Sequence, residues 1–218
     1  MATRHVLADV ADAWRHAGGD VAFESVGGVE AAQRVQDGET FDVVVLAAEA
    51  IDTLVASGRI VAGSRTALAR SEVAIAVREG ATRQAIDTEE ALREAVLAAQ
   101  TIGYSTGSSG VAVQQLFERW RIAEVIRARV VQAPPGVPVG TLIARGDVEL
   151  GFQQLSELVH LEGIDVIGPM PPGLEIVTTF SGGICTASTH ADAARALLDF
   201  IRSPAADDAK RHHGMQPA

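Results

Sequence analysis

Three short runs of small or polar residues stand directly before segments with helical character. After the second run, Val113, Leu116, Phe117 and Trp120 follow at the i, i+3, i+4 and i+7 spacing of a helix with one buried face. The runs comprise Ser25, Val26, Gly27 and Gly28 in "ESVGGVEAAQRV"; Ser105, Thr106, Gly107, Ser108, Ser109 and Gly110 in "YSTGSSGVAVQQLFERW"; and Gln153 and Gln154 in "GFQQLSEL".

A helix N-terminus offers unpaired N–H groups and about half a positive charge, and residues without bulky side chains let a ligand approach that backbone. Hydroxyl and amide side chains add neutral donors. The three runs therefore predict an oxyanion or carboxylate site that needs no Lys or Arg. The plainer reading stays open, because Ser, Thr and Gly are also the ordinary residues of helix caps and tight turns.

Some other chemistries lack their motifs. Gly103, Gly107 and Gly110 do not have the spacing of a dinucleotide-binding loop, and no phosphate-binding P-loop is present. The run "TGSSG" does not have the G-x-S-x-G form of a hydrolase turn. His212 and His213 near the carboxyl end indicate a solvated tail rather than a metal site. We expect no metal and no cofactor.

Composition narrows the class of protein. The 218 residues are 47% hydrophobic, enough for a sizeable core, and the net charge of −10 argues against a nucleic-acid partner. Cys185 is the only cysteine, so no internal disulfide can form. No apolar run reaches membrane-spanning or signal-peptide length.

Strand-like and helix-like segments alternate along the chain, which predicts an α/β fold with mostly parallel sheet. Thr88 is the expected N-cap of one helix, and Trp14 and Trp120 are expected to pack in the core. The expected strands are 41–47, 72–78, 101–105, 129–133, 148–153 and 175–188; the expected helices lie within 5–19, 27–38, 50–58, 88–100, 113–120 and 190–203.

Two of the strands, at 71–80 and from Glu175 onward, are interpreted as crossings between two lobes. Lobe 1 would then be discontinuous and comprise residues 1–76 and 178–218. Lobe 2 would comprise residues 77–177.

The order of segments resembles the molybdate-binding-protein branch of the type 2 periplasmic solute-binding proteins. The resemblance rests on "VGGVEAAQRVQDGETFDVVVLAAEAIDTLVASGRIV", "YSTGSSGVAVQQLFERWRI", "ARGDVELGFQQLSEL" and the final "FSGGICTASTHADAARALLDFIRSPAADDAKRHHGM". It implies two α/β lobes, each a mostly parallel sheet flanked by helices, joined by two crossing strands. It also implies a monomer that holds a small anion in the inter-lobe cleft and delivers it to the permease of an ABC transporter.

Carried over by position, the family's ligand-contacting regions fall at Ser25–Gly28 and Gly107–Gly110, and its hinge-proximal tyrosine falls near Gln153 and Gln154. Glycines replace hydroxyl side chains at 27 and 28, and glutamine stands where oxyanion binders have tyrosine. A planar carboxylate suits glutamine amide donors, so a di- or tricarboxylate is at least as good a candidate as molybdate or another oxyanion.

The amino end departs from the family pattern. Family members begin with a strand and a serine-bearing loop that touches the ligand, whereas the first helix here starts within five residues of Met1. Ala2 and Thr3 occupy the corresponding place and are included as candidate ligand residues. We expect the natural chain to begin earlier; the resemblance then implies a periplasmic protein, whereas a genuine start at Met1 implies a cytoplasmic one.

The sequence leaves more than one function open. The first is a solute-binding protein for a small anion. The alternative is a cofactor-independent isomerase acting on a tricarboxylate such as aconitate, as in the aconitate isomerases that share this fold. It would need a general base, for which Glu24, Tyr104 and His160 are candidates. A cytoplasmic ligand-sensing domain is the third possibility.

Overall fold

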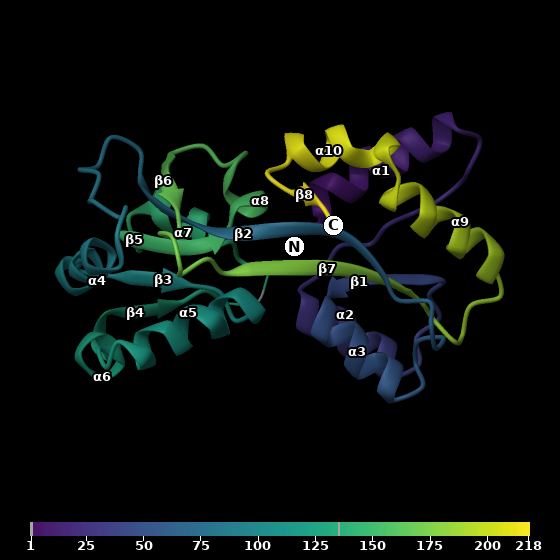
Figure 1. Ribbon diagram of the computed structural model, residues 1–218, viewed down its shortest axis with the longest axis horizontal. Helices are drawn as coiled ribbons and strands as arrows, with labels where there is room; N and C mark the ends of the chain where they lie inside the picture. The colour runs from purple at the N-terminus through teal and green to yellow at the C-terminus, as the bar shows by residue number, and fades with distance from the viewer. Residues whose placement is uncertain (1, 135) are drawn as a thin grey trace. The chain divides into compact units, whose positions relative to one another are not determined.

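The computed structural model describes residues 2–134 and 136–218 and divides the chain into two compact units. Unit 1 comprises Met1–Ser71 and Thr178–Ala218, and unit 2 comprises Glu72–Val177. Two strands, β2 (Thr66–Arg78) and β7 (Val177–Ile184), contain the boundaries between the units. Each unit is an α/β assembly with its own sheet and its own core (Figure 1).

Unit 1 has helices on both faces of its sheet (Figure 1). Helices α1, α9 and α10 cover one face, and α2 and α3 cover the other. Two adjacent glycines of β7 show how closely neighbouring segments pack on both faces: a Cβ on Gly182 would lie 2.3 Å from Leu198 of α9, and one on Gly183 would lie 2.7 Å from Ile60, which follows α3. The elements of unit 1 are α1 (Arg4–His16), α2 (Gly28–Gln36), β1 (Val43–Ala47), α3 (Ala48–Ala56), the first part of β2, most of β7, α9 (Ala191–Arg202), a short 3-10 turn (Pro204–Ala206), α10 (Asp207–His212) and β8 (Gln216–Pro217).

Unit 2 follows the same plan. Helices α4 and α5 pack on one face of its sheet through a core that includes Phe117 and Phe152, and α7 packs on the other face through Val139 and Ile143. The elements are the second part of β2, α4 (Glu89–Ala98), β3 (Ile102–Tyr104), α5 (Ser108–Arg119), α6 (Ala123–Ile126), a 3-10 turn (Arg127–Arg129), β4 (Val130–Gln132), α7 (Val139–Arg145), β5 (Leu150–Gln154), α8 (Leu155–Leu158) and β6 (Ile164–Pro169).

The α/β class is confirmed, but the sheets are mixed rather than mostly parallel. Strand β3 pairs in parallel with β4 and β5, whereas β2 pairs antiparallel with β5 and β6. In unit 1, β1 pairs antiparallel with β7, and β2 with β8. The parallel neighbours are those joined through helical crossovers, as parallel pairing requires. The antiparallel pairs all involve β2 or β7, which pair with β1, β5, β6 and β8. The alternation of strand and helix segments in the sequence cannot reveal the direction of these strands.

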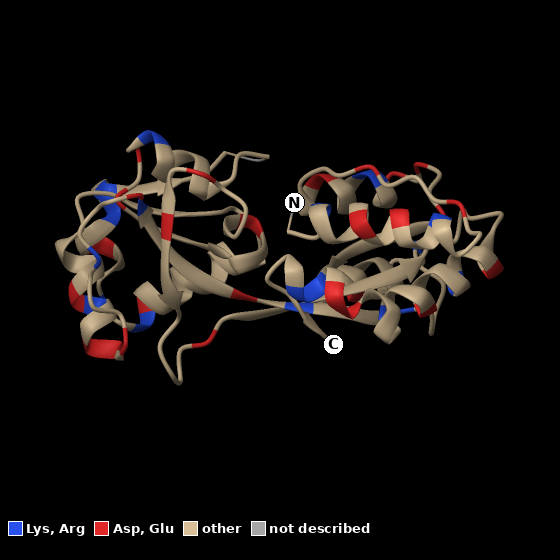
Figure 2. Cartoon of the chain, turned by 90° about the horizontal axis from the view of Figure 1, so that it is seen from above, with Lys and Arg blue, Asp and Glu red and all other residues tan. Residues whose placement is uncertain are grey.

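Several local expectations are confirmed. Thr88 caps α4, because its hydroxyl accepts a hydrogen bond from the Ala91 amide at 3.1 Å. Val113, Leu116, Phe117 and Trp120 are all buried in one cluster. Within the described residues, no helix is long and apolar enough to cross a bilayer. In the view of Figure 2, acidic and basic residues are interspersed over the helices and loops of both units.

Candidate functional site

The first small-residue run ends at the start of α2 in unit 1. Gly27 is the N-cap, with φ −60° and ψ 144°, and no side chain caps the helix. A Cβ added at Gly27 would meet nothing within 4 Å, and one at Gly28 would meet only Leu46 at 3.8 Å. Neither backbone conformation nor packing therefore demands glycine here, so the bare N-terminus of α2 is open to approach by a ligand.

The second run, Ser105–Gly110, leads into α5 in unit 2 and contains two different kinds of glycine. Gly107 is the N-cap, again without a side-chain cap, and its nearest neighbour to an added Cβ is the Ser105 Oγ at 3.7 Å. Gly110 is buried, and its Cβ would lie 1.7 Å from the Ser105 carbonyl oxygen. Gly110 is thus required by packing, whereas Gly107 is not.

The hydroxyl side chains of this second run are likewise of two kinds, buried and exposed. Ser109 is buried and its Oγ lies 3.4 Å from the Ser105 Oγ, so these two hydroxyls interact with each other. Thr106 and Ser108 are exposed. The outer face of the α5 N-terminus is therefore polar and accessible.

The glutamines of the third run are buried at the end of β5, where Gln153 is 2% exposed and Gln154 3% exposed. The Gln153 side chain is engaged within the protein: its Oε1 accepts a hydrogen bond from the Gly140 amide at 3.1 Å, and its Nε2 donates to Glu157 Oε2 at 2.6 Å. Gln153 therefore orients its neighbours through its side-chain amide, and its role as a ligand donor stays a prediction.

The strand register brings the second and third runs together within unit 2. Tyr104 stands opposite Phe152 in β5 and opposite Gln132 in β4, and all three strands are parallel. Their carboxyl ends therefore meet at one edge of the sheet, where α5, α7 and α8 begin. Open α/β sheets bind their ligands at such an edge. The run Ser25–Gly28 belongs to unit 1.

Ala2 and Thr3 lie at the start of α1. Ala2 is 6% exposed and packs in the unit 1 core. Thr3 is partly buried, makes no side-chain capping bond, and accepts a hydrogen bond from the Leu7 amide at 2.9 Å through its carbonyl. Their visible contacts are those of a helix start packed on a core.

Of the candidate bases, Glu24 is engaged in an ion pair. Arg34 donates to both its carboxylate oxygens, at 2.6 and 3.0 Å, and also binds Glu39. The hydrogen bond from Arg34 lowers the pKa of Glu24, which makes this exposed carboxylate a poor proton acceptor. Burial raises the pKa of Tyr104, whose ring packs on Phe117, and His160 is exposed just beyond α8.

The acidic group that sequence reasoning missed is Glu157. It lies in α8, is partly buried, and accepts the hydrogen bond from Gln153. Burial raises the pKa of its carboxyl group. The only sequence signal was its position four residues after Gln153, which helical spacing gives to many surface pairs.

Two further titratable side chains, those of His213 and Cys185, lie outside the small-residue runs. His213 is buried and lies 2.8 Å from Asp9 through its Nε2, so the expectation of a solvated tail is wrong at this residue. The helix α10 carries His213 onto α1, a contact that no local pattern predicts. Burial raises the pKa of Cys185 to about 11, so its thiol is a poor nucleophile.

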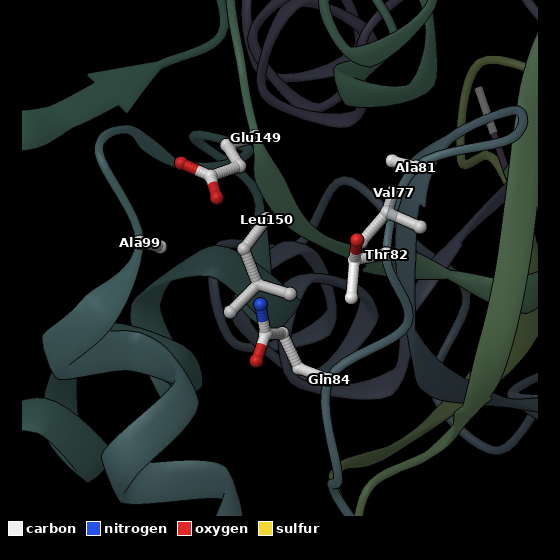
Figure 3. Close-up of a pocket in the computed structure, with 7 residues that line it drawn as sticks. All are labelled: Val77, Ala81, Thr82, Gln84, Ala99, Glu149 and Leu150. Atoms are coloured by element: carbon white, nitrogen blue, oxygen red, sulfur yellow. The ribbon is translucent and has the colours of Figure 1, made fainter.

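A small pocket lies elsewhere in unit 2 (Figure 3). Its volume is about 160 Å³, and it is lined by Val77, Ala81, Thr82, Gln84, Ala99, Glu149 and Leu150. Leu150 is the first residue of β5 and Ala99 precedes β3, so the pocket lies at the amino ends of these strands. Its Glu149 carboxylate would repel an anion, and the pocket does not include the small-residue runs.

Comparison with known proteins defines the class. Residues 1–216 match the family model described as bacterial extracellular solute-binding protein, so the chain belongs to that family. It is 39% identical over 187 residues to an aconitate isomerase from Pseudomonas sp., which covers 84% of this chain and 70% of that protein.

Solved structures confirm the fold. The periplasmic molybdate-binding protein of Azotobacter vinelandii has a TM-score of 0.80 at 17% identity, with 98% of this chain and 94% of that chain covered. The sulfate-binding protein of Mycobacterium tuberculosis has a TM-score of 0.74 at 16% identity, with 100% and 83% covered. The chain thus has the two-lobed type 2 periplasmic-binding-protein fold, as the sequence resemblance implied. At these identities the likeness concerns the fold alone.

Proposed function

We propose that this protein binds a tricarboxylate of the aconitate type and isomerises it by moving a proton between carbon atoms. The observation that carries the proposal is the 39% identity to an aconitate isomerase over 84% of the chain. The solved structures related to molybdate and sulfate binding share only 13% to 17% identity with this chain.

The site chemistry supports a carboxylate ligand. The N-termini of α2 and α5 present main-chain amides beside glycine caps, with exposed hydroxyls at Thr106 and Ser108. Such amides bind carboxylates and stabilise the additional negative charge that develops when a C–H bond next to a carboxylate loses its proton.

A second function is favoured by the family. Solute-binding proteins of this fold include molybdate and sulfate binders, so a receptor that hands a small anion to an ABC-transporter permease is the other candidate. It would bind one anion without changing it. A receptor function also requires the protein to reach the periplasm, which cell fractionation of the natural host checks.

The two functions are separated by incubating purified protein with cis-aconitate and following the ¹H NMR spectrum. The isomerase proposal predicts that trans-aconitate appears in proportion to protein concentration. In parallel, thermal unfolding is measured with cis- and trans-aconitate, citrate, molybdate and sulfate. A ligand at about 100 times its Kd should stabilise the protein by about 2.7 kcal/mol. Stabilisation by molybdate or sulfate without any turnover of aconitate would favour the receptor.

A further inference from the structure

One carboxyl group in unit 2 is placed and held as a proton-transfer group would be. Glu157 lies in α8, which directly follows β5 at the sheet edge where α5 and α7 also begin. That edge is where the exposed hydroxyls and the uncapped amides of α5 lie. The carboxyl group therefore lies at the same edge of the sheet as the α5 N-terminus, and Gln153 reaches it from the face that α7 covers.

The orientation of Glu157 is fixed by a buried relay. Gln153 is 2% exposed, and its Oε1 is anchored by the Gly140 amide of α7 at 3.1 Å. This anchor leaves the Nε2 of Gln153 pointing at Glu157, to which it donates at 2.6 Å. Only one of the two carboxylate oxygens, Oε2, takes part in that bond. A catalytic base must be held in this way by a neighbour whose own rotamer is locked.

Two other candidate bases near the small-residue runs, Glu24 and Tyr104, are less suited to proton transfer. Glu24 is neutralised by Arg34, and the Tyr104 hydroxyl belongs to a ring packed in the core against Phe117. Burial raises the pKa of Glu157 from the ordinary value of 4.5, which brings it closer to neutral pH. A base is most effective when its pKa lies near the working pH.

We propose that Glu157 is the general base and acid that moves the proton in the isomerisation, with Gln153 as its positioning residue. This inference rests on the proposed function.

The step is balanced without a cofactor. The Glu157 carboxylate removes a proton from the CH₂ carbon of aconitate, and the electron pair of that C–H bond forms a new C=C bond to the central carbon. The electrons of the old C=C bond move to the far carbon and its carboxylate. The Glu157 carboxylic acid then returns a proton to that far carbon, so the double bond has shifted by one position and the atoms are conserved.

The experiment compares the whole protein with three variants: Glu157→Gln, Glu157→Asp and the charge-matched control Glu162→Gln. Glu162 is an exposed glutamate of the same unit that takes no part in the site. A glutamine at 157 can still accept the Gln153 hydrogen bond but cannot take a proton. The readouts are conversion of cis- to trans-aconitate, incorporation of deuterium from D₂O into the recovered substrate, and thermal stabilisation by trans-aconitate.

Glu157→Gln should lower both conversion and deuterium incorporation by about 10²-fold or more while trans-aconitate still stabilises the variant. Glu157→Asp should retain more activity than Glu157→Gln, and Glu162→Gln should match the original protein. If Glu157→Gln converts aconitate within threefold of the original protein, the role of Glu157 is refuted and the isomerase function stands. If the original protein does not convert aconitate and is not stabilised by it, the proposed function is refuted. The role of Glu157 in that function is then refuted as well.

Discussion

The substitution Gly110→Ala tests the packing of the α5 N-terminus directly. Gly110 is the third residue of α5, and a Cβ at this position would lie 1.7 Å from the Ser105 carbonyl oxygen and 2.6 Å from its carbon. Both are backbone atoms, so rotation of a side chain cannot relieve the contact. The loop before α5 must move away by more than about 1 Å to reach the distances that Cβ atoms normally keep.

The expected change in the free energy of unfolding of Gly110→Ala follows from two opposing contributions. Overpacking that forces a backbone shift costs about 3 kcal/mol at the upper end of its usual range. Alanine in place of glycine in a helix returns about 1 kcal/mol. The net destabilisation is about 2 kcal/mol, which lowers the Tm of a protein of this size by roughly 4 to 8 °C.

Gly107→Ala is the matched control from the same loop. Its φ of −78° suits alanine, and the nearest atom to the new methyl group is 3.7 Å away. We expect the Tm to fall by no more than about 2 °C, while the methyl group obstructs the approach of a ligand to the α5 amides and weakens the stabilisation by trans-aconitate. Thermal unfolding of both variants, with and without ligand, is the assay. Equal loss of Tm in the two variants would refute the distinction between the two glycines.

Three further predictions concern separate parts of the chain. Thr88→Ala removes the side-chain cap of α4 and should cost about 1 kcal/mol, measured by urea unfolding. Cys185, whose pKa is about 11 because it is buried, should not react with a thiol reagent at pH 8 in the folded protein, where roughly one thiol in a thousand is ionised, but should react after denaturation. Burial raises the folded pKa of Glu157 above 4.5, so its contribution to stability is complete below that pH and is lost as the pH rises through the folded value. Relative to Glu157→Gln, the original protein should therefore gain stability between neutral pH and pH 4, and an unchanged difference in Tm would contradict this.

Sequence reasoning recovered the elements whose signal is local. The spacing of Val113, Leu116, Phe117 and Trp120 specifies one face of α5, and Thr88 stands where a helix cap must stand. Strand β6 at Ile164–Pro169 was overlooked, because its residues run directly into the proline-rich turn that follows. Strand β2 begins at Thr66, six residues before the expected start, since its first six residues, "TALARS", contain only one β-branched residue and so lack the composition of a strand.

Three residues make tertiary contacts that the sequence did not indicate. Gly110 resembles a ligand-approach glycine in the sequence, and only the position of the Ser105 carbonyl shows that packing requires it. Gln153 resembles an exposed donor after a strand, yet the Gly140 amide and Glu157 occupy its side chain. His213 packs onto α1 more than two hundred residues away in the chain. Contacts at such separations leave no periodic signal.

The most direct test of the account is a titration of ¹⁵N-labelled protein with trans-aconitate, followed through its backbone amide resonances. If main-chain amides at a helix start hold the ligand, the largest shifts will occur at residues 107–110 or at residues 27–29 and will saturate as trans-aconitate is added. Shifts concentrated instead at Thr82 and Gln84 in the small pocket, or absent from both helix starts, would contradict the account.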